Sequence, residues 1–373
     1  MLVDATAVPA DRGGVGRYVD GLVSALDAAG ADLALVCQRS DSERYGRLAP
    51  NAQVVPGPSA IAHRPARLAW EQTSIAEVAD LVGATVVHSP HYTMPLHAGR
   101  PVVVTIHDLT FFTEASMHDA VKGTFYRSAT RTAVRRATRV VVPSKATRDE
   151  MVRVLDADAT EIDVAYHGVD PATFHIPTDV ERDRITGRLG LGDRPYVAFL
   201  GTLEPRKNVP ALIRGWVEAV AERPEPPALV LAGGSGWDIE VDAAVASVPS
   251  HLSVLRPGYL RFADLPGYLG GAIVVAYPSF GEGFGLPVLE AMACGAAVLT
   301  TPRLSLPEVG GDAVAYTEPE SHAIGRDLAA LLDDPARRAM LSEAGHARST
   351  EFTWASSAEA HLASYDLAAR RAA

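Results

Sequence analysis

The sequence predicts an α/β protein that is built from two doubly wound, parallel sheets. Short β-branched runs alternate with longer helical patterns along the whole chain, and the series restarts after a polar, proline-marked stretch at 167–184. Several runs are apolar almost throughout, which is typical of strands buried on both faces of a parallel sheet. We therefore expect two Rossmann-like domains that face one another across a cleft.

The expected strands fall into two series that the stretch at 167–184 separates. Those of the first series span 2–8, 33–37, 53–56, 85–89, 101–107, 139–144 and 161–167, and those of the second span 196–201, 228–234, 252–258, 272–279, 296–301 and 313–317. Helical patterns fill the intervals, such as the amphipathic segment 18–30 that ends at Gly30. The final stretch, 355–373, predicts a long terminal helix.

Length and composition limit the class of protein. A chain of 373 residues, of which 47% are hydrophobic, suggests about two domains with sizeable cores. The net charge of -11 argues against a nucleic-acid-binding protein. Cys37 and Cys294 lie far apart, so we expect no disulfide framework and no thiolate metal site. The sequence has no signal-peptide pattern and no apolar run of ~18 residues, which predicts a cytoplasmic or peripheral protein.

The stretch SFGEGFGLPVLEAMACG, residues 279–295, predicts a ligand-binding turn between a strand and a helix. Pro287 favours a helix that begins near Leu286, and the N-terminus of such a helix favours an anion. The glycines of the loop let a ligand approach the backbone closely. Glu282 lies in this loop, and Glu290 lies in the expected first helical turn. The alternative, a tight turn with two solvent-facing acids, does not explain so many glycines.

The stretch FLGTLEPRKNVPALIRGW, residues 199–216, also runs from a strand end to a helix start. Asn208 is the expected N-cap, and Arg206 with Lys207 would stand beside it. Two cations at this place would complement a diphosphate. The alternative is a solvated basic pair. However, the chain contains only three lysines, so a lysine beside an arginine at a ligand-binding edge favours a phosphate site.

A glycine-rich loop follows the first expected strand. Gly14, Val15 and Gly16 open a helix, but Val19 stands where a dinucleotide fingerprint needs its third glycine. The loop therefore allows close backbone approach but lacks the NAD signature.

Several histidines end strands of the first series. His107 follows the most apolar of these strands, and we expect it to point into the cleft with a functional role. We interpret His88, His91 and His167 as structural. The spacing of His88 and His91 loosely suits a metal, but neither a carboxylate nor a thiol lies near them in sequence.

A basic segment, 121–148, contains eight basic residues and no acid. Arg127, Arg131 and Arg135 recur every four residues and would form one stripe on a helix. The stripe is either a solvated face or a contact with anionic lipid head groups or a lipid-phosphate acceptor.

Taken together, the segments GVGRY, HDLTFF, GTLEPRKN and SFGEGFGLPVLEAMACG resemble the retaining glycosyltransferases of family 4, which have the GT-B fold. The resemblance extends over essentially the whole chain, in order. Its specific parts are the Glu-x7-Glu spacing and the Arg-Lys pair. One departure is His167, since the family usually has Asn before Gly-Val-Asp.

The resemblance implies that the carboxy-terminal domain holds a nucleotide sugar. Arg206 and Lys207 would bind its diphosphate in place of a metal ion, so no metal and no cofactor are expected. Glu290 would hold the ribose hydroxyls, Glu282 the hydroxyls of the transferred sugar, and His107 would contact that sugar near the reacting carbon. The catalytic set would be Glu282, His107, Arg206 and Lys207. The further donor-binding residues would be Gly201, Tyr259, Leu260, Gly283, Phe284, Gly285 and Leu286, while Gly14, Val15 and Gly16 would line the phosphate and acceptor side.

By the same resemblance, 1–177 would form the acceptor-side domain and 178–353 the nucleotide-sugar domain, with a helix at 354–373 crossing back to the first. HDLTFF with GTLEPRKN looks most like bacterial mannosyltransferases that act on surface polysaccharides. GDP-mannose is therefore the first expected donor, and a glycan or a lipid-linked molecule the expected acceptor. A UDP-sugar or ADP-sugar donor remains open, as does a protein that binds a nucleotide sugar without turnover.

Overall fold

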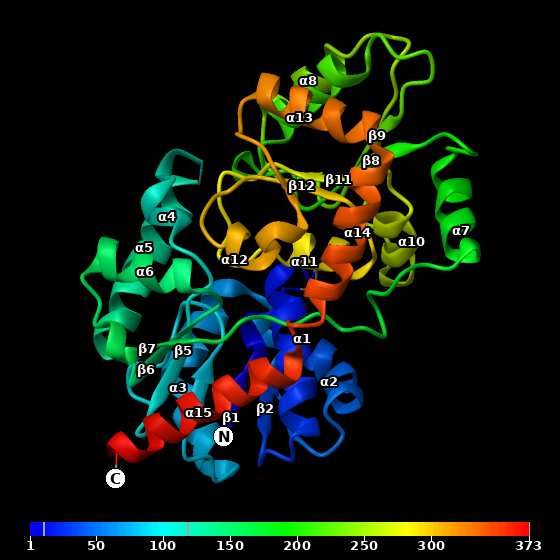
Figure 1. Ribbon diagram of the computed structural model, residues 1–373. Helices are drawn as coiled ribbons and strands as arrows, with labels where there is room; N and C mark the ends of the chain where they lie inside the picture. Colours follow the sequence, from blue (N-terminus) through cyan, green and yellow to red (C-terminus); the bar gives the residue numbers. More distant parts are fainter. Residues whose placement is uncertain (10–11, 118, 373) are drawn as a thin grey trace. The chain divides into compact units, whose positions relative to one another are not determined.

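The computed structural model describes residues 1–9, 12–117 and 119–372, which form two compact units (Figure 1). Unit 1 comprises Met1–Gly168 and Thr353–Ala373, and unit 2 comprises Val169–Phe352. The first boundary falls earlier than the expected one after residue 177. The backbone N–H of Val169, the first residue of unit 2, donates to the carbonyl of Phe352, its last residue, at 3.0 Å. The chain therefore enters and leaves unit 2 at neighbouring points.

Unit 1 contains a parallel sheet in which the strand order is β3-β2-β1-β4-β5-β6-β7. Its strands are β1 (Leu2–Asp4), β2 (Ala34–Cys37), β3 (Gln53–Pro56), β4 (Val87–Ser89), β5 (Val102–Thr105), β6 (Arg139–Val142) and β7 (Ile162–Val164). Every residue of β1, β2, β4, β5 and β6 is buried. This burial explains why these segments are apolar almost throughout.

Helices cover both faces of this sheet (Figure 1). They are α1 (Gly14–Ala28), α2 (Ser42–Leu48), α3 (Arg64–Leu81), α4 (Thr110–Thr113), α5 (Ala120–Arg136), α6 (Lys145–Leu155) and α15 (Trp354–Ala372). The core on one face contains residues of α1, α2 and α15, and the core on the other contains residues of α3, α5 and α6. The terminal helix α15 is therefore an integral part of unit 1.

Unit 2 contains a second parallel sheet, in which the strand order is β10-β9-β8-β11-β12-β13. Its strands are β8 (Tyr196–Leu200), β9 (Ala228–Ala232), β10 (Val254–Gly258), β11 (Val274–Tyr277), β12 (Val298–Thr300) and β13 (Ala315–Tyr316). Its helices are α7 (Asp179–Leu189), α8 (Val209–Val220), α9 (Glu240–Ala246), α10 (Leu265–Gly270), α11 (Leu286–Ala293), α12 (Leu306–Gly310), α13 (Ser321–Asp333) and α14 (Pro335–Ser349). Strand order reverses between β8 and β11, which is where open α/β sheets bind ligands.

Each expected strand is present, but two details of the prediction are wrong. The first strand ends at Asp4 rather than at residue 8, because the Asp4 carboxylate accepts from the N–H and hydroxyl of Thr6 at 2.9 and 2.6 Å and starts a 3-10 turn. The expected linker at 167–184 ends early, since α7 begins at Asp179. Thr178 and Glu181 form a capping box there, a signal that the sequence contains.

Candidate active site

Two loops that follow neighbouring parallel strands form a compact polar cluster in unit 2. The strands β8 and β11 pair directly, so their carboxyl ends lie together. After β8 the chain forms a short 3-10 helix, Pro205–Lys207, before α8. After β11 it forms the glycine-rich loop before α11. The sheet thus brings together the two segments that the sequence singled out separately.

Glu282 is the centre of this cluster. Its Oε2 atom accepts from a guanidinium nitrogen of Arg206 at 2.6 Å, and its Oε1 atom accepts from the ammonium group of Lys207 at 2.6 Å. Both Glu282 and Lys207 are buried, with 7% and 8% of their surface exposed. Arg206 also pairs with Glu204 at 2.7 Å. Two cations and two carboxylates therefore balance in charge.

The cluster keeps Glu282 ionised. Burial alone would raise the pKa of Glu282, but the positive charges of Arg206 and Lys207 outweigh it and hold the pKa at about 2. Burial also lowers the pKa of Lys207, and the charge of Arg206 adds to this effect. The charges of Glu282 and Glu204 oppose it.

Tyr277 and Ser279 complete the cluster, although sequence reasoning did not assign them a role. Both hydroxyls donate to the Oε1 atom of Glu282, at 3.0 Å and 2.7 Å. With Lys207, this oxygen accepts from three groups, whereas Oε2 accepts from Arg206 alone among the described residues. Since a carboxylate oxygen has two lone pairs, Oε2 is the atom with capacity left for a ligand hydroxyl.

The helix α11 begins at Leu286, as the sequence predicts, after Gly285 with φ 101°. Phe284 and Leu286 are buried beside this turn. Glu290 is buried as well, with 1% of its surface exposed. It is the fifth residue of α11, so its placement in the first turn was wrong. Glycine suits position 285 because few other residues adopt this backbone conformation.

Asn208 does precede α8, but its expected capping role is wrong. Its backbone is left-handed, with φ 58°, and its side chain makes no cap hydrogen bond. Instead, its amide donates to the carbonyls of Pro319 at 2.7 Å and Pro278 at 3.3 Å. Asn208 thus ties the β8 loop to the segment after β11.

The remaining donor-side candidates follow β8 and β10. The N–H of Gly201 donates to the carbonyl of Ala232 at 2.9 Å, which continues the β8–β9 pairing past the strand. Tyr259 follows β10 directly and is 59% exposed, and Leu260 is half-buried. A Cβ atom at Gly234 would lie 2.6 Å from the Tyr259 hydroxyl, so a larger residue there would displace the exposed Tyr259 side chain.

In unit 1, His107 follows β5 and is fixed by one hydrogen bond. Its Nε2 atom lies 2.8 Å from the carbonyl oxygen of Pro90. Because a carbonyl only accepts, Nε2 must carry the proton, which makes Nδ1 an acceptor. Burial lowers the pKa of His107 against the opposing effects of Pro90 and Asp108, so the ring is neutral near pH 7. Its ring packs edge-on against Tyr18, with centroids 5.1 Å apart.

The other histidines differ in their surroundings. His88 is fully buried and both its ring nitrogens are hydrogen-bonded, to Thr105 and Tyr365 at 2.8 Å each, which agrees with a structural role. His167 packs on Tyr18, with centroids 4.7 Å apart. His91 instead lines a pocket of unit 1, which the sequence-based assignment did not anticipate.

The glycine-rich loop forms the start of α1, at Gly14. A side chain at Gly16 would lie 2.7 Å from the Cβ atom of Arg12, so this glycine permits tight packing. A side chain at Gly14 would meet no described atom within 4 Å. Val15 lines the same pocket as His91.

The basic stripe on α5 is partly engaged in packing. Arg127 donates to the carbonyl of Phe111 at 3.0 Å, and Arg131 lies 5.0 Å from the centre of the Phe112 ring. Arg135 is exposed. Among the described residues, no helix is long and apolar enough to cross a membrane. The described part of the chain also contains no group of three or more His, Cys, Asp or Glu side chains that could hold a metal ion.

Family models match both halves of the chain. A model described as "Glycosyltransferase Family 4" matches residues 12–173, and one described as "Glycosyl transferases group 1" matches residues 181–348. The chain belongs to the family 4 glycosyltransferases with the GT-B fold.

Similar curated proteins include two kinds of bacterial transferase. The chain is 29% identical over 293 residues to O-antigen chain mannosyltransferase B of Escherichia coli, which covers 78% of this chain and 74% of that protein. It is 31% identical over 301 residues to D-inositol 3-phosphate glycosyltransferase of Mycolicibacterium smegmatis, covering 76% and 67%. It spans only 49% to 63% of the length of several other proteins with the latter name.

A solved structure supports the fold. HepE of Anabaena, in complex with UDP-glucose, superimposes with a TM-score of 0.77 over 98% of both chains, at 18% identity. At this identity the likeness concerns the fold. The protein is thus a glycosyltransferase with two parallel-sheet units.

Proposed function

We propose that the protein is a retaining glycosyltransferase that transfers a hexose, most simply mannose from GDP-mannose, to a glycan or lipid-linked acceptor without a metal ion. The observation that carries this proposal is the ion-paired cluster of Glu282, Arg206 and Lys207 at the carboxyl ends of β8 and β11. A diphosphate leaving group needs cations, and an electron-poor sugar carbon needs a nearby carboxylate. The cluster contains both within one hydrogen-bonded unit.

Each residue has a proposed task. Arg206 and Lys207 would bind the diphosphate and stabilise its charge as the glycosidic bond breaks. The Oε2 atom of Glu282 would accept from a hydroxyl of the transferred sugar, and Glu290 from the ribose. His107 would accept a further sugar hydroxyl at Nδ1. The acceptor would attack from the face that the diphosphate leaves, and a donor phosphate oxygen would take its proton.

The choice of GDP-mannose rests on the similarity to the E. coli mannosyltransferase. A UDP-sugar is the second candidate, favoured by the UDP-glucose complex of HepE. A melting-temperature screen against GDP-mannose, UDP-glucose and ADP-glucose separates them, because a ligand at 100 times its dissociation constant adds about 2.7 kcal/mol to stability. We expect the largest shift with GDP-mannose. A larger shift with UDP-glucose would identify a UDP-sugar, and not GDP-mannose, as the donor. Release of free nucleotide when an acceptor is added would distinguish a transferase from a protein that only binds the donor.

A peripheral position at a membrane is part of the proposal. The exposed part of the α5 stripe, above all Arg135, is the surface that would contact anionic head groups.

A further inference from the structure

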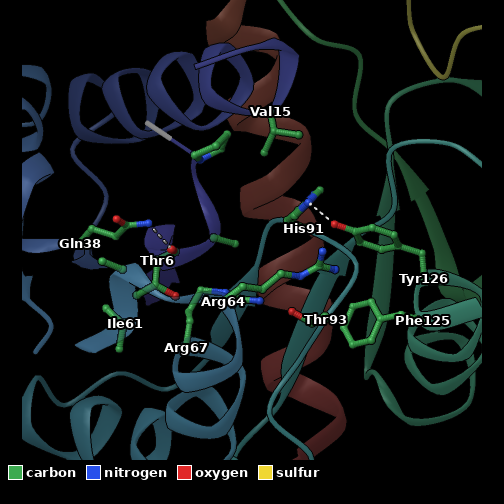
Figure 2. Close-up of a pocket in the computed structure, with 13 residues that line it drawn as sticks. Thr6, Val15, Gln38, Ile61, Arg64, Arg67, His91, Thr93, Phe125 and Tyr126 are labelled. Atoms are coloured by element: carbon green, nitrogen blue, oxygen red, sulfur yellow. Dashed lines mark hydrogen bonds between the residues drawn. The ribbon is translucent and has the colours of Figure 1, made fainter. Parts of the chain in front are cut away.

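Unit 1 contains a pocket whose lining residues all belong to that unit (Figure 2). Its volume is about 340 Å³, which falls in the range of ~300–1,000 Å³ that is typical of ligand sites. The start of α3, the loop after β4 and the first half of α5 contribute to its walls. Apolar side chains such as Val15 and Ile61 lie beside polar and aromatic ones, so the pocket has the mixed lining of a specific ligand site.

Arg64 is the prominent cation of this pocket. Its guanidinium lies 4.8 Å from the ring centre of Phe125 and 5.2 Å from that of Tyr126, and Figure 2 shows it directed at both rings. These contacts with the aromatic rings leave the guanidinium N–H groups without a hydrogen-bond partner among the described residues, so they are available to a ligand. Among the described residues, no carboxylate pairs with Arg64. It is also the first residue of α3, where the helix dipole favours an anion.

Arg67, one turn further along α3, differs from Arg64 because its charge is already paired with a carboxylate. It is 7% exposed and pairs with Glu71 at 2.9 Å, and Glu71 accepts in turn from Thr93 at 2.7 Å. Asp4 also lies near Arg67, but neither Asp4 nor Glu71 lines the pocket. Among the described residues, Arg64 is therefore the pocket-lining arginine that has no ion-pair partner.

His91 and Tyr126 add hydrogen-bonding capacity at the same wall. The Nε2 atom of His91 lies 3.4 Å from the Tyr126 hydroxyl, and its buried Nδ1 atom has no partner among the described residues. A buried ring nitrogen without a partner is costly unless a ligand or water satisfies it. The His91 ring lies 5.7 Å from that of His107, so the pocket adjoins the proposed sugar-contacting residue.

We propose that this pocket binds the acceptor through an oxyanion, a phosphate or carboxylate carried on a sugar or cyclitol ring, with Arg64 as the anion ligand. The proposal rests on the proposed function, since it takes unit 1 as the acceptor side. The guanidinium of Arg64 meets the oxyanion by charge-assisted hydrogen bonds. His91 and Tyr126 meet the ring hydroxyls, and the apolar wall meets the carbon face of the ring.

Binding by the full chain, measured by saturation-transfer NMR with GDP present to occupy the proposed donor site, tests this assignment. The probes are mannose 6-phosphate, mannuronic acid and the neutral methyl α-mannoside. We expect at least one charged probe to bind about tenfold or more tightly than the neutral one. Preference for mannose 6-phosphate alone would identify the oxyanion as a phosphate, and preference for mannuronic acid alone as a carboxylate.

The variant Arg64→Gln should abolish the preference, whereas Arg47→Gln, at an exposed arginine of the same unit, should keep it. Equal binding of charged and neutral probes, no binding of either charged probe, or a preference that survives Arg64→Gln would overturn the proposal. The readout does not depend on turnover or on the transferred sugar. A wrong assignment of the transferred sugar would therefore leave this result unchanged.

Discussion

The hydroxyl of Tyr18 on α1 lies 2.8 Å from the Nε2 atom of His361 on α15. The Nδ1 atom of His361 donates to the carbonyl of Ser357 at 2.7 Å, so Nε2 is unprotonated and accepts from Tyr18. Tyr18 then accepts from Thr105, which accepts in turn from His88, at 2.8 Å each. This buried chain of hydrogen bonds links α15 to β4 and β5. Tyr18, at its centre, also packs against His107.

Removing the Tyr18 hydroxyl should destabilise unit 1. The variant Tyr18→Phe leaves the Nε2 atom of His361 buried without its donor, which costs about 1–3 kcal/mol. Denaturant unfolding measures this loss. Tyr259→Phe is the control, because that residue is 59% exposed, and its unfolding free energy should stay near that of the wild type. Equal unfolding free energies of Tyr18→Phe and wild type would show that this series of hydrogen bonds contributes nothing to stability.

The same network predicts how stability changes with pH. Burial lowers the pKa of His361 from 6.5 to about 4, although Ser357 opposes the shift. Between these two values the unfolded chain binds a proton that the folded protein excludes, so stability should fall as the pH falls from 6.5 towards 4, by up to roughly 3 kcal/mol. In His361→Gln the pH dependence over this window should be weaker than in the wild type. Identical slopes of unfolding free energy against pH in the two proteins would show that His361 does not cause the pH dependence.

Substitutions of Glu282 and Glu290 should affect different kinetic constants. Glu282→Gln should lower kcat about 10- to 100-fold, because it weakens contacts to the reacting sugar, whereas Glu290→Gln should mainly raise the KM for the donor. Glu318→Gln, at an exposed acid of unit 2, serves as the control. Melting temperatures must accompany the assay, since Glu282→Gln also removes the charge partner of buried Lys207. If both variants raised only KM, the task proposed for Glu282 would be wrong.

The α5 stripe makes a separate prediction. Cosedimentation with anionic vesicles at low salt should fall when Arg127, Arg131 and Arg135 are changed to Glu, since each cation near such a surface contributes about 1 kcal/mol. Vesicles of neutral lipid are the control. Because Arg127 and Arg131 already contact α4, Arg135→Glu alone should account for a large share of the loss. Equal binding by both proteins, or none by either, would leave the stripe as ordinary surface.

Much of the fold follows from local patterns, because buried parallel strands are recognisable as short apolar runs. The positions of Arg206 and Glu282 after strands were also predictable, but not that they form one ion-paired group. That depends on β8 and β11 being neighbours, which local sequence does not encode. Arg64 was missed for a similar reason, since its aromatic partners lie about sixty residues further along the chain, on α5.

We propose that Arg206 and Lys207 bind the donor diphosphate in place of a metal ion. The most direct measurement is the melting-temperature shift that GDP-mannose produces in the presence of EDTA, for the wild type, Arg206→Ala and Lys207→Ala. We expect a full shift in the wild type with or without EDTA, and a small or absent shift in both variants relative to their own ligand-free state. A wild-type shift that disappears with EDTA and returns with magnesium or manganese would show that a metal ion binds the diphosphate. A shift that persists in both variants would show that neither Arg206 nor Lys207 is needed to bind it.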